Sequence, residues 1–213
     1  MLPTVSTGSV RYLRALSGSK DWFWGADHTD GDLYEAEELY QLHHRIDRTR
    51  LILVRDGDLR VFEPVAPRAG QYFGQPIFHA GAPLILLADF PERVIRVLRF
   101  DPESGGTTTV MELPREAFED CYNLQLHVSP LMLTRQTAGR FQILWPYTAD
   151  FPIEPTESFD TRVGERLYFS RWHETPDYWE DAVVRDARTG AVLEVLPAAL
   201  CLLPDGRSWL LTD

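Results

Sequence analysis

Lysine is almost absent from this sequence, and basic residues as a class are outnumbered by acidic ones. Lys20 is the single lysine, and 32 acidic residues face 21 basic ones, which gives a formal net charge of −11. A surface of this sign repels the phosphates of nucleic acids and of anionic lipids. We therefore expect neither a nucleic acid nor a membrane as a partner.

Cysteine is also scarce. Cys121 and Cys201 are the only two, they form no C-x-x-C pair, and each lies in an apolar stretch, so we expect buried free thiols. No apolar run is long enough to cross a membrane, and residues 1–9 lack the basic and apolar regions of a secretory signal. These absences favour a cytoplasmic protein.

Motifs for nucleotide binding and for common hydrolases are missing as well. The sequence contains no phosphate-binding loop, no dinucleotide fingerprint, no H-E-x-x-H and no G-x-S-x-G. We therefore predict no cofactor, and we assign no catalytic residue.

What the sequence does contain is a series of short apolar runs closed by turn residues, which is typical of β-strands. The predicted strands form four groups: Asp21–Trp24, Arg50–Arg55 and Leu59–Val65; Pro83–Asp89, Val94–Phe100 and Thr107–Leu113; Pro130–Arg135 and Arg140–Tyr147; Arg166–Arg171, Ala182–Asp186 and Ala191–Leu196. Repeats of about 40 to 50 residues with several strands each are typical of propeller blades.

Three hairpins carry a resemblance to known families. The segments Phe100–Gly105 and Arg185–Leu193 resemble the outer hairpins of WD40-like and kelch-like β-propellers, and Leu203–Gly206 resembles the turn of TolB-like propeller repeats. The resemblance implies a fold at the superfamily level and no activity. We predict an all-β single domain over residues 1–213, a small β-propeller-like array of four to five antiparallel blades. A two-sheet β-sandwich is the alternative.

A fifth blade begins with the hairpin at Leu203–Leu211, and it is only half present in this pattern. A strand over Ser9–Leu16 could complete it and remove an exposed edge. Otherwise the ring stays open or completes itself across a homodimer.

One segment has helical rather than strand periodicity. Leu33, Ala36 and Tyr40 follow helical spacing, and glutamates occupy the early turns, where they suit the helix dipole. We predict a helix inserted at about 32–44, with His43 and His44 in its last turn.

The acidic segment before this helix, 27–32, has some features of a calcium-binding loop. Position 6 of that loop, where an EF-hand requires glycine, is Asp32, so the motif fails. We predict a solvated turn and no metal.

Histidines recur at matching places in the repeats. His79 and His127 precede the second and third groups of strands, and His28 and His173 follow strands of the first and fourth. Imidazoles can act as acid, base or ligand near neutral pH. The predicted ligand-binding residues are therefore His79, His127, Asp27, His28, Asp89, Trp172 and His173. The alternative is that these histidines are half-buried structural residues.

Aromatic residues suggest what such a site binds. Trp172, Tyr178 and Trp179 look exposed, whereas Trp22, Trp24 and Trp145 are expected to fill the space between blades. We expect a non-catalytic binding module that presents a loop face to a sugar-like ligand or a protein partner. The alternative is a sugar-active hydrolase or lyase of the five-bladed type, with Asp27, Asp89 and Glu174 as its carboxylates.

Overall fold

The computed structural model describes residues 2–203, 205 and 207–212. It is an all-β protein of five antiparallel sheets with one short α-helix, and it divides into two compact units, Met1–Cys121 and Tyr122–Asp213. Each unit is described by itself below. A single domain over the whole chain stays a prediction. No helix of the described residues has the length and apolar character needed to span a membrane.

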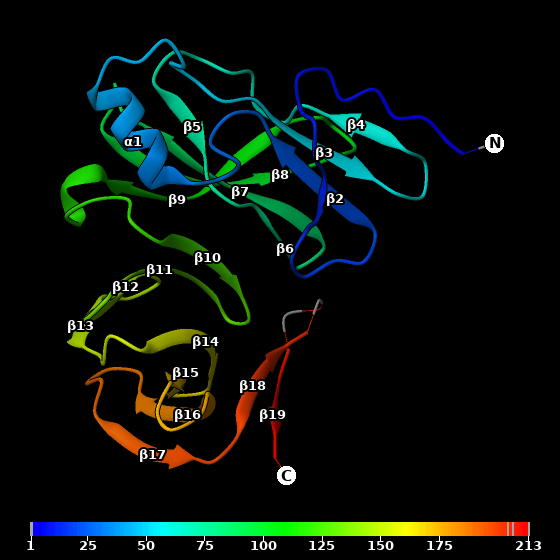
Figure 1. Cartoon of the computed structure of the whole chain (residues 1–213). Coiled ribbons are helices and arrows are strands. Elements are labelled where there is room, and N and C mark those ends of the chain that lie inside the picture. Colours follow the sequence, from blue (N-terminus) through cyan, green and yellow to red (C-terminus); the bar gives the residue numbers. More distant parts are fainter. Residues whose placement is uncertain (1, 204, 206, 213) are drawn as a thin grey trace. The chain divides into compact units, whose positions relative to one another are not determined.

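The first unit contains two sheets (Figure 1). The first sheet runs in the order β1 (Arg14–Ala15), β2 (Trp22–Ala26), β3 (Leu51–Arg55) and β4 (Arg60–Phe62). The second runs β5 (Gln71–Phe73), β7 (Ala82–Asp89), β8 (Val94–Phe100) and β9 (Thr107–Pro114), and β6 (Ile77–His79) also pairs with β7.

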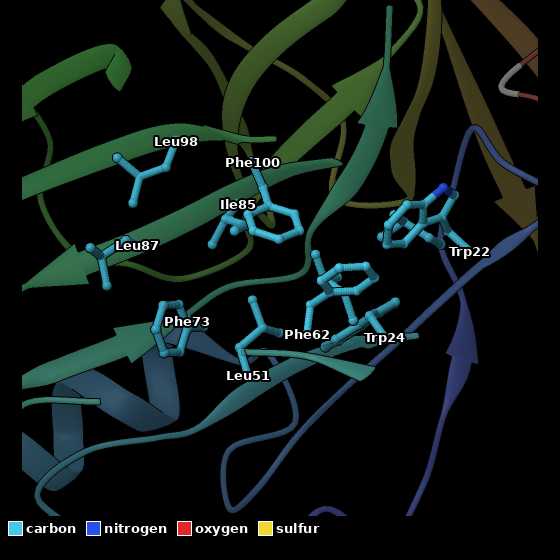
Figure 2. Close-up of a cluster of buried hydrophobic side chains, with 11 residues drawn as sticks. Trp22, Trp24, Leu51, Phe62, Phe73, Ile85, Leu87, Leu98 and Phe100 are labelled. Carbon is cyan, nitrogen blue, oxygen red and sulfur yellow. The ribbon is translucent and has the colours of Figure 1, made fainter. Parts of the chain in front are cut away.

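Side chains from both sheets form one apolar core in this unit (Figure 2). Trp22 and Trp24 of β2 are buried, as the sequence predicts, and Trp22 packs against Phe62 with ring centroids 5.5 Å apart. β7 is buried along its whole length, which explains its unbroken apolar sequence.

The predicted helix is confirmed as α1 (Leu33–Gln41), and it ends earlier than expected. The carboxylate of Asp32 accepts the backbone N–H groups of Tyr34 and Glu35, which caps the first turn. His43 adopts a left-handed φ of 48°, so the two histidines lie beyond the helix and not in its last turn.

Buried polar contacts fix the helix to the end of the same unit. Glu37 forms an ion pair with Arg115, which lies in a short 3-10 helix, η1 (Arg115–Ala117). Its other oxygen accepts the N–H of Cys121 at 2.8 Å. Cys121 is a buried free thiol, as predicted, whereas Cys201 is only half-buried.

The second unit contains three sheets. Their strands are β10 (Leu124–Val128), β11 (Leu131–Thr137), β12 (Arg140–Trp145) and β13 (Ala149–Pro152); β14 (Glu157–Val163), β15 (Arg166–His173), β16 (Trp179–Asp186) and β17 (Val192–Leu196); and β18 (Ala199–Leu202) with β19 (Ser208–Leu211). Within each sheet, neighbouring strands follow each other along the chain.

A buried ion pair and a glycine stabilise the β14–β17 sheet. Arg185 forms two hydrogen bonds of 2.8 Å with Glu157, whose side chain is 1% exposed, and donates a third to the carbonyl of Gly190 at 2.7 Å. Gly190 has a φ of 71°, and a Cβ there would lie 2.1 Å from the ring of Phe151. The turn therefore requires glycine.

The predicted strands are present, and several others were missed. β10, β13 and β14 interleave polar residues with apolar ones and lack a continuous apolar run. The N-terminal strand was overestimated, because only Arg14–Ala15 pairs, and it pairs with β2. The β-sandwich alternative has two sheets, whereas the structure has five. Pro204 and Gly206 of the third hairpin lie outside the described residues.

Candidate functional site

A pocket of about 610 Å³ lies in the first unit, beside the turn that follows β2. We call it the N-terminal pocket; it is lined by Gly8, Ser9, Arg11, Tyr12, Ala26, Asp27, His28 and Asp30. Asp27 and His28 were predicted from the sequence as ligand-binding residues, and the structure brings them together here. Its volume lies within the range of small-molecule sites, about 300–1,000 Å³.

One wall of this pocket is the N-terminal segment, which lies close against β2. Val10 is buried, and a Cβ on Gly25 would lie 2.3 Å from the carbonyl oxygen of Tyr12. Only glycine allows two backbones to approach this closely. The approach holds Arg11 and Tyr12 beside the turn after β2.

The other wall is a turn with an unusual backbone. His28 and Asp30 have φ values of 61° and 50°, a left-handed conformation that costs a residue with a Cβ about 1–2 kcal/mol. Thr29 between them is buried, which anchors the turn, while His28 is exposed. Strained residues of this kind cluster at ligand sites.

Both carboxylates of the pocket are held in place by donors. Asp27 Oδ2 accepts the hydroxyl of Ser9 at 2.8 Å, and its Oδ1 accepts the N–H of Arg50 at 2.7 Å. Asp30 forms an ion pair with Arg14. No hydrogen bond or ion pair joins the side chain of Arg11 or Tyr12 to another described residue, and Tyr12 is 78% exposed.

Asp89 lies elsewhere in the first unit and has structural partners. It is buried at the end of β7, where it accepts a hydrogen bond from Gln71 at 2.7 Å and lies 3.2 Å from Arg96. It also accepts the N–H of Glu92 at 3.2 Å, which shapes the turn after β7. The structure does not bring Asp89 into the N-terminal pocket.

His79 and His127 occur in different compact units, so their predicted convergence stays a prediction. His79 is half-buried at the end of β6, directly before the Ala80–Gly81 turn. His127 lies on β10, where its Nε2 is 2.7 Å from the hydroxyl of Thr134 and its ring meets Phe159 edge-on. These contacts fit the structural alternative for His127.

His127 gives a testable pH dependence. Burial lowers the pKa of its imidazole to about 4, whereas the unfolded value is about 6.5. Between these pH values the unfolded chain binds more protons, so this residue's contribution to stability is lost as the pH falls, by up to about 3 kcal/mol. Urea unfolding between pH 4 and 7 should show a weaker pH dependence for His127→Gln than for the native chain. Identical pH dependence in both would contradict this role.

Trp172 and His173 lie at the tip of the β15–β16 hairpin in the second unit. His173 is the last residue of β15 and His28 follows β2, so both lie at the end of the second strand of their sheet. The His173 ring stacks on Trp179 at 3.8 Å between centroids, and its Nε2 lies 3.4 Å from the Asp181 carboxylate.

The Asp181 carboxylate is buried beneath this stack. Burial alone would raise its pKa, but the hydrogen bonds from Arg171, at 2.6 and 2.9 Å, outweigh burial and hold the pKa below its usual value. The Arg171–Asp181 pair therefore joins β15 to β16 on this side of the hairpin. Whether Trp172 and His173 share a site with Asp27 and His28 stays a prediction, since the two pairs belong to different units.

Three residues of the N-terminal pocket were missed as ligand-binding residues: Arg11, Tyr12 and Asp30. The first two lie in a segment without regular structure, and tertiary contacts place them: the close approach to Gly25, the burial of Val10 and the hydrogen bond from Ser9 to Asp27. The D-x-x-D spacing of Asp27 and Asp30 was considered only as part of a calcium loop. Among residues 2–203, 205 and 207–212, no group of three His, Cys, Asp or Glu side chains is arranged to hold a metal ion.

Comparisons with known proteins identify no family. No family model matches this chain, and no curated protein shows significant sequence similarity to it.

Proposed function

We propose that this protein is a non-catalytic carbohydrate-binding module whose ligand occupies the N-terminal pocket. The observation that carries the proposal is a concave site that combines a guanidinium without an ion pair among the described residues, two fixed carboxylates and an exposed tyrosine ring.

The mixture of charges favours a neutral polyol over a charged ligand. Arg11 supplies donors, Asp27 and Asp30 supply acceptors, and a sugar hydroxyl can serve both. Hydrogen bonds to charged groups are worth about 1.5–3 kcal/mol each. The ring of Tyr12 can pack against the apolar face of a sugar, as aromatic side chains do in mixed polar sites.

The hydrogen-bond partners of the two carboxylates favour binding over hydrolysis. Glycosidases require one carboxyl group that donates a proton and a second that acts as base or nucleophile. Asp27 accepts two hydrogen bonds and Asp30 is paired with Arg14, so in this geometry both carboxylates serve as hydrogen-bond acceptors. The sugar-active enzyme remains the second outcome of the experiment below.

We also propose that the sheets are blades of a small β-propeller. Three antiparallel sheets of four strands, one of five and one of two, each built from strands that are close in the chain, support this arrangement. A crystal structure should show the sheets arranged around one axis. Sheets stacked face to face in two layers would contradict it.

The test of sugar binding is calorimetric titration of the full chain with a panel of neutral mono- and disaccharides. Tyr12→Ala and Arg11→Ala should each weaken binding about tenfold, because each removes about 1.4 kcal/mol or more of contact. Arg45→Ala is the matched control, since Arg45 is also exposed but lies outside the pocket, and it should bind as the native chain does.

Two results would overturn the proposal. If no sugar of the panel binds, or if the Arg11 and Arg45 variants lose equal affinity, the pocket is not a sugar site. If the native chain releases reducing sugar from a bound disaccharide, the enzyme alternative replaces the non-catalytic one.

A further inference from the structure

A second recognition surface lies on the β15–β16 hairpin of the second unit, outside the N-terminal pocket. Residues directly opposite each other on antiparallel strands share a face, and successive residues alternate. Trp172 lies opposite Glu180, whereas His173 lies opposite Trp179 on the reverse side. The hydroxyl of Tyr178 donates to Glu180, so Tyr178 joins the side of Trp172. We call Trp172, Tyr178 and Glu180 the hairpin face.

A second carboxylate extends this face. Ser170 lies two residues before Trp172 and therefore on the same side of β15. A β-bulge between Phe159 and Thr161 leaves Asp160 outside the ladder, and its carboxylate accepts both the N–H and the hydroxyl of Ser170, at 2.9 and 2.6 Å. Burial raises the pKa of Asp160, the two hydrogen bonds from Ser170 partly offset this rise, and the negative charge of Glu180 adds a smaller repulsion between the two carboxylates.

The hairpin face carries negative charge and exposed aromatic rings without a compensating cation. Trp172 is 41% exposed and Tyr178 is 67% exposed. In the part of the chain that the structure describes, no arginine or lysine forms an ion pair with Asp160 or Glu180. Arg171 belongs to the same sheet, but its side chain lies on the reverse side, where it pairs with Asp181.

We propose that the hairpin face binds a small organic cation of the ammonium type. Its charge would lie over the rings of Trp172 and Tyr178 and beside Glu180, which combines a cation–π interaction with a charge pair. A bound cation would also relieve the repulsion between Glu180 and Asp160. An anionic ligand would increase that repulsion, and a neutral one would leave it unchanged.

Choline and its uncharged isostere 3,3-dimethyl-1-butanol provide the direct test, by calorimetric or NMR titration of the full chain. Cation–π contacts and one carboxylate predict a dissociation constant for choline of the order of 1 mM, and binding of the isostere at least about tenfold weaker. Raising the salt concentration should weaken choline binding.

Two variants test the charge pair and the cation–π interaction separately. Glu180→Gln should weaken choline binding about tenfold and leave the isostere unaffected, and Trp172→Ala should weaken choline binding by a similar factor. Trp209→Ala is the control, because Trp209 is 55% exposed in the same unit but lies on β19, and it should bind choline as the native chain does. Equal affinity for choline and its isostere, or unchanged binding in Glu180→Gln with native thermal unfolding, would overturn the proposal. So would the absence of choline binding.

Discussion

Replacing Glu157 by alanine is expected to destabilise the chain by about 3–5 kcal/mol, the largest single effect that the structure predicts. The variant removes the two carboxylate oxygens that accept hydrogen bonds from the Arg185 guanidinium. The Arg185 side chain is 9% exposed, and the carbonyl of Gly190 remains as its acceptor. Arg171, which pairs with Asp181, lies directly opposite Glu157 in the sheet, so a second positive charge loses one of its neighbouring carboxylates. The measurement is the free energy of unfolding in urea.

The control for this prediction is an ion pair of similar geometry at the surface. Arg140 forms two hydrogen bonds with Asp150, at 2.6 and 2.7 Å, and the two side chains are 53% and 41% exposed. Because solvent screens exposed pairs, Asp150→Ala should cost at most about 1 kcal/mol. Equal losses of stability in the two variants would contradict the claim that burial makes the Glu157–Arg185 pair more important for stability than an exposed pair.

Gly190→Ala is expected to cost about 2–5 kcal/mol, the second-largest effect. The left-handed φ contributes about 1–2 kcal/mol, and the new methyl group would overlap the Phe151 ring, an overpacking that typically costs 1–3 kcal/mol. The same turn supplies the carbonyl that Arg185 needs, so a shift of the backbone would also weaken the ion pair.

Gly57→Ala is the matched control for that variant. Gly57 lies in the turn between β3 and β4, and a Cβ there would meet no atom within 4 Å. We expect a change within about 0.5 kcal/mol, in either direction. A Gly190→Ala protein as stable as Gly57→Ala would contradict the packing of Phe151 against this turn.

The sequence predicted the parts of the fold that depend on continuous apolar burial. β3 and β7 were found because a short run of successive apolar residues bounded by turn residues is typical of a strand buried on both faces. β14 was missed because it contains Asp160, whose place in a bulge is set by its contact with Ser170 rather than by its own preference. Local patterns do not contain such tertiary contacts.

The candidate site shows the same division. Asp27 and His28 could be found, because a polar turn between a strand and a helix is visible in the sequence. Arg11 and Tyr12 could not, since their position beside the pocket depends on tertiary contacts of their segment, such as its close approach to Gly25. His127 was grouped with the site by its place in the repeat, but position along a strand does not reveal that Thr134 and Phe159 contact its ring.

Amide chemical-shift mapping tests the central claim, that the N-terminal pocket binds a sugar, most directly. With a neutral sugar that binds the full chain, the account predicts shifts concentrated at residues 8–12 and 26–30, and their loss in the Tyr12→Ala variant. Shifts confined to the hairpin face at 172–180, or a map that Tyr12→Ala leaves unchanged, would contradict it.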